Sequence, residues 1–449
     1  MTRRLLCALL LLCAAPLSAQ QVGIPHRTFT LPNGLRLIVH EDHSVPMAAV
    51  NVWYHVGSGY EEPGRTGFAH LFEHVMFEGS ANVPEGEFDN LLEAAGANNN
   101  GSTDSDRTNY YEVMPSNAVD LALWLEADRM GGLLQTMGQT KLDVQRDVVK
   151  SERRQRYENQ PYGLFFPTAS KELYPAGHPY SWPGIGSMED LSAASLADVE
   201  GFFRRYYVPN NAVVVVAGDV NADSVHRSVQ RFFGWIPRGA AVTRPSVEIP
   251  PIPATKYATL EDRVTLPQVN LLWRTTKAYA PGDAALTALS SILTQGKNSR
   301  LYKRLVYEEQ VAQDVSAFNY SRLLSGDFFL TITGREGIAL DRLEAAALEE
   351  IGKLAAAPPT AEELQRVKSA LETQIIGSLE SLETRADLLN QYLYYRGAPD
   401  EVNEVLQEFR DLTPADIQSA ARDYLVGKNR VVISIVPTGQ TTLAAREDR

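Results

Sequence analysis

Residues 70–74 read His-Leu-Phe-Glu-His, with two histidines four positions apart and a glutamate between them. On a helix, positions i and i+4 share a face, so both imidazoles can reach one metal ion. At about 100° per residue, His70, Glu73 and His74 fall within an arc of about 100°, and apolar residues fill the opposite side. Two unrelated core or surface histidines are the alternative, but this spacing beside a glutamate, in a chain with 8 histidines, favours a metal site.

A catalytic zinc site has three protein ligands and leaves one position open for water. Glu152 is the candidate third ligand, because the apolar stripe of a predicted helix over 141–157 surrounds it. The positions within about 80° of Glu152 on that helix are Leu142, Val144, Gln145, Val148 and Val149. An inward carboxylate without a partner is unfavourable, and a bound cation offsets that penalty. An ordinary buried salt bridge is the alternative.

The motif needs a helix that displays it and strands that hold this helix in place. A helix is expected over residues 67–78, with Thr66 capping its start and Gly79 ending it. Further helices are predicted at 86–95, 117–131, 141–157, 196–206, 283–293, 340–354, 360–378 and 414–424. Strands are predicted at 35–39, 48–56, 109–114, 213–217, 269–273, 328–333 and 431–436. Because helices and strands do not alternate strictly, the predicted fold class is α+β.

The chain contains one pattern twice. Residues 198–214 and 416–432 align without a gap, each with a helical pattern that runs into a turn and a β-branched strand. This similarity indicates an internal duplication, although only the first copy carries the histidine motif. A Pro-rich stretch separates the copies. The predicted domains are a signal peptide (1–19), a zinc-binding catalytic domain (20–240), a linker (241–257) and a metal-free homologous domain (258–449).

The N-terminus and the composition restrict where the protein works. A basic start, an apolar run from Leu5 to Leu17 and small residues before Gln20 predict a secretory signal peptide over residues 1–19. We therefore expect export, to the periplasm of a Gram-negative bacterium. Both cysteines lie in this segment, so no disulfide or catalytic thiolate is expected in the mature protein. The formal charge of −13 argues against a nucleic-acid partner, and no later apolar run has the length of a membrane span.

The histidine motif followed by Glu152 resembles the zinc site of the pitrilysin/insulinase metallopeptidases, the inverzincins, which include mitochondrial processing peptidase. Further matching stretches are Phe77-Glu78-Gly79-Ser80, Asn100-Gly101-Ser102-Thr103, His178-Pro179-Tyr180 and Tyr207-x-Pro209-Asn210-Asn211. The resemblance covers nearly the whole mature chain. It implies two homologous α/β-sandwich halves of the LuxS/mitochondrial-processing-peptidase-like metallohydrolase type. It also implies one zinc ion per chain, with His70, His74 and Glu152 as its ligands.

The resemblance further implies a zinc-dependent endopeptidase with Glu73 as general base. Zinc lowers the pKa of a bound water from 15.7 to about 7. Glu73, next to a ligand, can take that water's proton and pass it to the leaving amine. In family members the segment Asn100, Gly101, Ser102 and Thr103 is an edge strand, to which an extended peptide adds by backbone hydrogen bonds. The expected substrates are therefore extended peptides or unfolded segments, although a plain polar turn is the alternative for this segment.

Three departures from the family pattern affect the expected activity. Gln145 stands where the family often has a glutamate that supports the zinc ligands, and Gly101 replaces the usual alanine. Active single-chain members carry an Arg and a Tyr, seven apart, in the metal-free half, where this chain has Val306 and Gln313. We therefore expect a heterodimer with a homologous subunit that carries the Arg/Tyr pair. The alternative is a self-sufficient monomer or homodimer that uses Arg300 or Tyr320.

Two other functions compete with peptide hydrolysis. A non-catalytic structural subunit, like the family's respiratory-complex core proteins, tends to lose the zinc motif, which this chain keeps. A metal-storage protein would not need Glu73. Zinc stoichiometry together with the cleavage of a quenched peptide separates the three functions.

Overall fold

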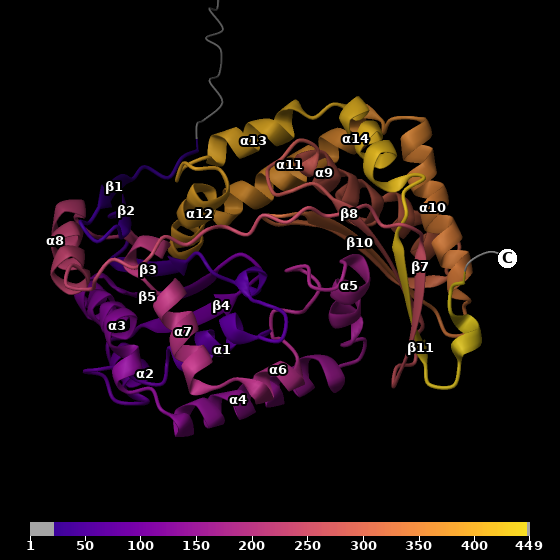
Figure 1. Cartoon of the computed structure of the whole chain (residues 1–449). Coiled ribbons are helices and arrows are strands. Elements are labelled where there is room, and N and C mark those ends of the chain that lie inside the picture. The colour runs from indigo at the N-terminus through magenta and orange to yellow at the C-terminus, as the bar shows by residue number, and fades with distance from the viewer. Residues whose placement is uncertain (1–21, 447–449) are drawn as a thin grey trace, which may run out of the picture.

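Two β-sheets, one from each half of the chain, organise the computed structural model, which describes residues 22–446 (Figure 1). The predicted signal peptide lies outside the described residues. The first sheet has the order β1-β2-β6-β3-β5-β4 and the second β7-β11-β8-β10-β9. The strands are β1 (Arg27–Thr30), β2 (Arg36–Glu41), β3 (Met47–Tyr54), β4 (Asn98–Thr103), β5 (Thr108–Pro115), β6 (Ala212–Gly218), β7 (Lys256–Asp262), β8 (Gln268–Thr275), β9 (Ala312–Ser321), β10 (Gly326–Gly334) and β11 (Val431–Pro437).

The second sheet repeats the first one without β1. Each contains one parallel pair, β2 with β6 and β7 with β11, and the remaining pairs follow in the same antiparallel order. The α+β class and the two homologous halves expected from the sequence are therefore confirmed. In this correspondence β4 and β9 are equivalent, and each is the last strand of its sheet with one free edge.

Most of the helices in each half cover one face of the sheet in the same half. Those of the first half are α1 (Phe68–Val75), α2 (Glu87–Ala94), α3 (Val119–Gly132), α4 (Gln139–Arg153), α5 (Phe165–Leu173), α6 (Met188–Ala193), α7 (Leu196–Tyr206) and α8 (Ala222–Phe233). Those of the second half are α9 (Asp283–Thr294), α10 (Leu340–Ala356), α11 (Ala361–Ser378), α12 (Leu382–Tyr395), α13 (Val402–Asp411) and α14 (Pro414–Ala420). None of the helices within residues 22–446 is long and apolar enough to cross a membrane.

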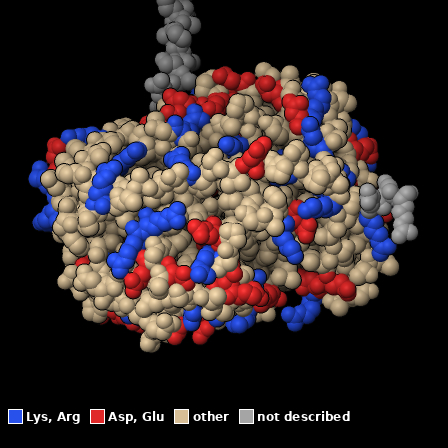
Figure 2. Space-filling model, viewed as in Figure 1, with Lys and Arg blue, Asp and Glu red and all other residues tan. Residues whose placement is uncertain are grey.

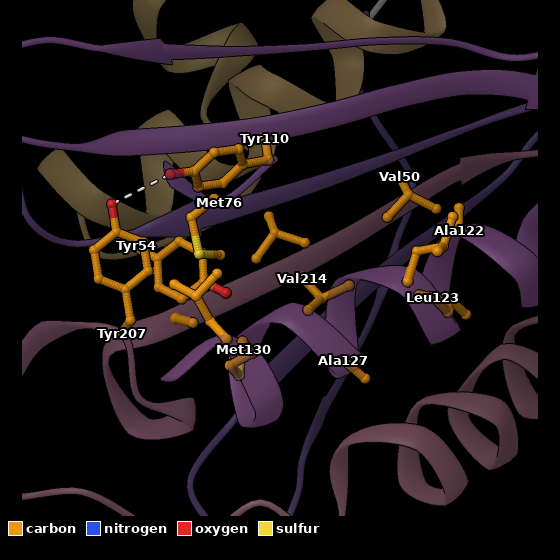
Figure 3. Packing of buried hydrophobic residues seen from close by; sticks show 14 of the residues in the cluster. Val50, Tyr54, Met76, Tyr110, Ala122, Leu123, Ala127, Met130, Tyr207 and Val214 are labelled. Carbon is orange, nitrogen blue, oxygen red and sulfur yellow. Dashed lines mark hydrogen bonds between the residues drawn. The ribbon is translucent and has the colours of Figure 1, made fainter. Parts of the chain in front are cut away.

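The core of the first half holds α1 and α3 against the sheet. Strand residues such as Val50 and Val214 face Leu123 of α3 (Figure 3). Met76, which follows the last residue of α1, packs beside buried tyrosines. The hydroxyls of the buried Tyr110 and Tyr207 lie 3.3 Å apart in this core. Because the core encloses the apolar face of α1, the opposite face of that helix is fixed in direction.

One helix from each half also packs against the sheet of the other half. From the second half, α12 packs on the outer face of β3 and β6, where Leu389 shares an apolar cluster with Ile38. From the first half, α5 packs on the second sheet, where Phe165 shares a cluster with Ile433. This exchange interlocks the two halves, as the position of α12 beside β3 shows (Figure 1).

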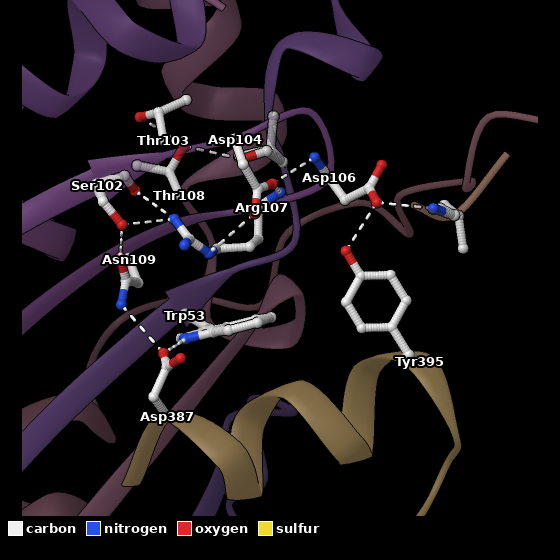
Figure 4. Close-up of polar contacts among 12 residues, drawn as sticks. Trp53, Ser102, Thr103, Asp104, Asp106, Arg107, Thr108, Asn109, Asp387 and Tyr395 are labelled. Atoms are coloured by element: carbon white, nitrogen blue, oxygen red, sulfur yellow. Dashed lines mark hydrogen bonds and ion pairs between the residues drawn. The ribbon is translucent and has the colours of Figure 1, made fainter. Parts of the chain in front are cut away.

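A polar network at the β4–β5 turn joins the halves (Figure 4). The carboxylate of Asp387 on α12 accepts hydrogen bonds from Trp53 Nε1 at 2.8 Å and from Asn51 Nδ2 at 3.3 Å. Tyr395, near the end of the same helix, donates its hydroxyl to Asp106 Oδ2 at 2.7 Å. The second half therefore fixes the position of the turn that follows the edge strand β4.

The connection between the halves has no regular secondary structure. The chain from the end of α8 to β7 forms no helix or strand, and β7 begins at Lys256, inside the last residues of the predicted linker 241–257. On the face seen in Figure 2, acidic and basic side chains are interspersed.

Candidate metal centre

The start of α1 is fixed by a glycine and a distant carboxylate. Gly67 precedes the helix with φ of 89°, and a Cβ there would lie 2.6 Å from a backbone carbonyl oxygen, so only glycine fits. The carboxylate of Glu61 accepts hydrogen bonds from the N–H groups of Gly67 at 3.0 Å and Ala69 at 2.8 Å. The prediction that Thr66 caps this helix is wrong, because its hydroxyl donates to Asp190 instead.

Helix α4 brings Glu152 to the histidines of α1. Its buried residues are Leu142, Gln145 and Val149. The predicted apolar stripe around Glu152 is only half right, since Val144 and Val148 are 52% and 42% exposed. The buried arc lies to one side of Glu152, so the carboxylate stands at the edge of the packed face rather than in its middle.

His70, His74 and Glu152 converge at one point, as expected for the candidate ligand set. The Oε2 atom of Glu152 lies 3.1 Å from His74 Nε2 and 3.7 Å from His70 Nε2. One donor atom from each of the three side chains falls within 4.8 Å of the others, and this is the one such group of His, Cys, Asp or Glu found among residues 22–446. Two imidazoles and one carboxylate match the donor set of catalytic zinc sites.

The protonation state of His70 and the buried polar atoms near it suit a cation. Burial lowers the pKa of His70 to about 4, so its imidazole is neutral at pH 7, as metal binding requires. Among the described residues, neither His70 Nδ1 nor Glu73 Oε2 has a hydrogen-bond partner, although both atoms are buried. An unpartnered buried carboxylate oxygen is unfavourable by itself. The donor set and this unpartnered oxygen together fit a catalytic zinc site, in which His70, His74 and Glu152 would hold the ion and Glu73 would act on the water that it activates.

Burial raises the pKa of Glu73, and three neighbours oppose this shift: the Thr103 hydroxyl, His74 and Arg107. The carboxylate therefore holds a proton more readily than an exposed glutamate does. Glu73 sits on the same face of α1 as the two histidines, but it is not one of the three converging groups. Its position suits a group that exchanges protons beside the metal rather than a group that binds it.

The segment Asn100, Gly101, Ser102 and Thr103 lies in the edge strand β4, not in a polar turn. The strand passes directly beside Glu73, because a Cβ at Gly101 would lie 3.1 Å from the Cγ atom of Glu73. The side-chain Oδ1 of Asn100 accepts a hydrogen bond from the N–H of Gly101 at 2.8 Å. This N–H group is exposed and bonds to a side chain, and it lies in the edge strand that an added strand would pair with.

Gln145 has a carboxylate partner that the sequence did not indicate. Its Nε2 donates to Oε1 of Glu78 at 2.6 Å, and the backbone oxygen of Glu78 accepts from Lys141 Nζ at the same distance. Glu78 follows the end of α1 by three residues, so a carboxylate does lie beside Gln145 but comes from the segment after α1. Position 145 has no carboxylate, as expected, but the carboxylate of Glu78 lies beside it.

A cavity of about 390 Å³ opens beside His70 and reaches into the second half. It is lined by Ser58, His70, Thr103, Asp104, Ser105, Arg156, Tyr157, Phe166, Ser170, Trp182, Pro183, Gly184, Ile185, Phe318, Tyr320 and Arg322. Most of these residues were not predicted, because they come from separate loops, helices and strands of both halves that only the tertiary packing brings together. The paired aromatics Phe165-Phe166 after a Pro-Tyr-Gly turn were the available signal.

The second-half residues named from the sequence lie in different parts of the structure. Tyr320 lines the cavity that contains His70. Arg300 does not, because Glu363 holds its guanidinium with contacts of 2.8 and 3.0 Å. Val306 packs against the second apolar core, and Gln313 is exposed on β9.

Known proteins resemble this chain over nearly its whole length. The model of the insulinase family (peptidase family M16) matches residues 36–174, and that of the peptidase M16 inactive domain matches residues 193–371. Zinc protease PqqE of Helicobacter pylori is 29% identical over 433 residues, 96% of this chain and 97% of that protein. A probable mitochondrial-processing peptidase subunit beta of Arabidopsis thaliana is 23% identical over 427 residues, 92% and 78% of the two chains. The crystal structure of a protease from Helicobacter pylori, 29% identical, covers 93% of this chain and 100% of its own, with a TM-score of 0.87.

Proposed function

Since this chain belongs to the insulinase family of peptidases, we propose that it is a zinc-dependent endopeptidase that hydrolyses extended peptides or unfolded segments. The observation that carries the proposal is the buried Glu73 Oε2, which lacks a hydrogen-bond partner and stands beside three converging zinc-type donors. A protein that only stored a metal would need the donors but not this carboxylate. A structural subunit would need neither.

The side chains divide the reaction between them. His70, His74 and Glu152 hold one zinc ion, which supplies Lewis acidity to a water molecule and to the scissile carbonyl group. Glu73 takes the proton from the attacking water and delivers it to the leaving amine nitrogen. Its raised pKa favours the protonated state that the second of these steps needs.

The edge strand β4 positions the substrate in this proposal. An extended peptide that pairs with Asn100, Gly101, Ser102 and Thr103 runs past Glu73, because Gly101 is in contact distance of that side chain. The Asn100 side chain, which covers the N–H of Gly101, gives way to a backbone carbonyl of the peptide. The glycine lets the peptide backbone and Glu73 approach each other closely.

Zinc titration combined with peptide cleavage tests the function. The purified chain is expected to bind one zinc ion and to cleave a quenched peptide, to lose cleavage after chelation and to regain it with added zinc. A digest of a peptide library read by mass spectrometry then gives the cleavage preference. Stoichiometric zinc binding without any cleavage, alone or with a homologous subunit, would identify a storage or structural protein instead.

We also propose that the protein acts outside the cytoplasm, on the evidence of residues 1–19. Fractionation of the producing cells and N-terminal sequencing of the mature chain test this. A full-length N-terminus in the cytoplasmic fraction would contradict it.

A further inference from the structure

The two carboxylate oxygens of Glu152 have different neighbours. Oε2 faces the histidines, at 3.1 Å from His74 Nε2 and 3.7 Å from His70 Nε2. Oε1 instead forms an ion pair with Arg156, whose Nε atom lies 2.9 Å away. The arginine therefore fixes the orientation of the carboxylate from the side opposite to the predicted metal.

A local change of helix type accompanies Arg156. The regular helix α4 ends at Arg153, and residues 154–158 continue as a π-helical turn in which the N–H of Asn159 bonds to the carbonyl of Arg154 at 2.8 Å. Such widened turns are rare and occur mostly at functional sites. The turn lies directly after the predicted ligand Glu152 and contains the side chain that contacts it.

Arg156 has no ion pair among the described residues that competes with its contact to Glu152. Among the described residues, Glu152 is its one ion-pair partner, and its side chain is 66% exposed. It also lines the cavity that contains His70. The neighbouring Arg153 has other partners, since it pairs with Glu158 and donates to the carbonyl of Gly186. Arg154 is exposed, and its side chain forms no hydrogen bond or ion pair with the described residues.

We propose that Arg156 is a positioning residue of the metal centre, which holds Oε1 of Glu152 so that Oε2 alone faces the zinc ion. This inference rests on the proposed function. A catalytic zinc site needs an open position for water, and a carboxylate that binds through both oxygens would take up that position. Groups that orient metal ligands typically change metal affinity by about 10–100-fold when they are removed. Because Arg156 is largely exposed, its contribution belongs at the lower end of this range.

Zinc affinity, measured by competition with a chromophoric chelator, tests the role without relying on catalysis. R156A is expected to raise the zinc dissociation constant about tenfold relative to the unsubstituted protein. R156K, which keeps the charge but not the planar guanidinium, is expected to recover at least half of that loss on a logarithmic scale. R154A is the matched control, because it removes an arginine two residues away that does not contact Glu152, and it is expected to leave affinity within twofold.

Three results would overturn the assignment: an R156A dissociation constant within twofold of the unsubstituted value, an equal loss in R154A, or no recovery in R156K. Because the side chain is exposed, its removal opens no buried cavity, and R156K provides the comparison if R156A does not fold. A chain that binds zinc but cleaves nothing would contradict the proposed function and leave this comparison intact. A chain that binds no zinc would contradict both.

Discussion

At the scale of single residues, Glu73 and the two histidines lie on one helix face but have different surroundings. The histidines point their Nε2 atoms at Glu152, whereas Glu73 keeps a buried, unpartnered oxygen beside β4. We therefore expect Glu73→Gln to keep its zinc and to lose at least about 10²-fold in kcat/KM, because the amide cannot accept the proton. Metal content by atomic absorption and peptide hydrolysis measure the two effects separately.

The ligand variants give the opposite pattern. His70→Ala and Glu152→Ala are each expected to lose zinc together with activity, since each removes one of three donors. Glu93→Gln is a suitable control, because it changes an exposed glutamate near the motif. A Glu73→Gln protein without zinc, or a Glu152→Ala protein with normal zinc and activity, would show that the roles are assigned wrongly.

Residue spacing predicts the arrangement of the two candidate histidine ligands well, because it reports local geometry. The spacing of His70 and His74 fixes their common face whatever surrounds the helix. The environment of Glu152 was predicted less accurately, since Val144 and Val148 are exposed and only one side of the stripe is buried. Contacts between separate elements, such as Glu78 with Gln145, depend on the packing of two helices and leave no signal in either segment alone.

At the scale of elements, α1 depends on a buried carboxylate at its start. Burial raises the pKa of Glu61 to about 8, against an ordinary value of 4.5. The folded protein therefore binds one more proton than the unfolded chain between about pH 4.5 and 8. Glu61 contributes its full stabilisation below about pH 4.5. The free energy of unfolding then falls by up to about 1.4 kcal/mol per pH unit as the pH rises from 4.5 to 8.

We expect Glu61→Gln to remove this pH dependence, because the amide resembles the protonated carboxyl group and does not ionise. The difference in Tm between the variant and the unsubstituted protein should shift in favour of the variant from pH 5.5 to pH 8.5. Glu62→Gln is the matched control, since Glu62 is the adjacent and exposed glutamate. A difference that stays constant over this range, or an equal change in Glu62→Gln, would contradict the assignment.

The elements were predicted unevenly, and periodicity alone does not account for which of them were found. The buried strands β3, β6 and β11 follow from their β-branched runs. Strand β4 reads Asn-Asn-Asn-Gly-Ser-Thr and has no such pattern, so only pairing with β5 makes it a strand. Helices α5, α8, α12 and α13 were not predicted. The apolar face of α8 is regular, so its pattern was available in the sequence. Helices α5 and α12 each pack on the sheet of the other half, which is a long-range arrangement that a single segment does not encode.

At the scale of the whole molecule, the interlocked halves restrict the substrate. Because α5 and α12 each pack on the opposite sheet, a substrate reaches the site through the existing cavity and along the free edge of β4. Strand addition requires an extended chain. We therefore expect cleavage of unfolded polypeptides and no cleavage of the same polypeptides when they are folded.

A small disulfide-bonded protein tests this expectation in two forms. The reduced and alkylated form should be cut at several positions, and the native form should remain intact over the same time, as read by mass spectrometry. Both cysteines of the peptidase precede residue 20, so the comparison does not depend on its own thiols. Efficient cleavage of the native form, without prior unfolding, would contradict the strand-addition proposal.

The whole molecule also lacks donors that the family pattern places in the metal-free half. Val306 packs in the second core and has no donor, and Gln313 has neither the charge of arginine nor the phenol of tyrosine. A donor aimed at a developing oxyanion is commonly worth about 3–4 kcal/mol. We therefore propose that the chain alone is a poor enzyme and that it works as a heterodimer with a homologous subunit that carries the Arg/Tyr pair but lacks the histidine motif.

Tyr320 is the in-chain competitor to such a partner, because it lines the cavity with His70, whereas Arg300 is bound to Glu363. The two explanations differ in what they require of the purified chain. With a partner, kcat/KM should rise at least about 10²-fold when the homologue is added, which corresponds to one donor of this strength. Tyr320→Phe should then change activity little. Full activity of the chain alone, unaffected by the homologue and reduced 10²-fold or more in Tyr320→Phe, would instead show that this chain supplies its own donor.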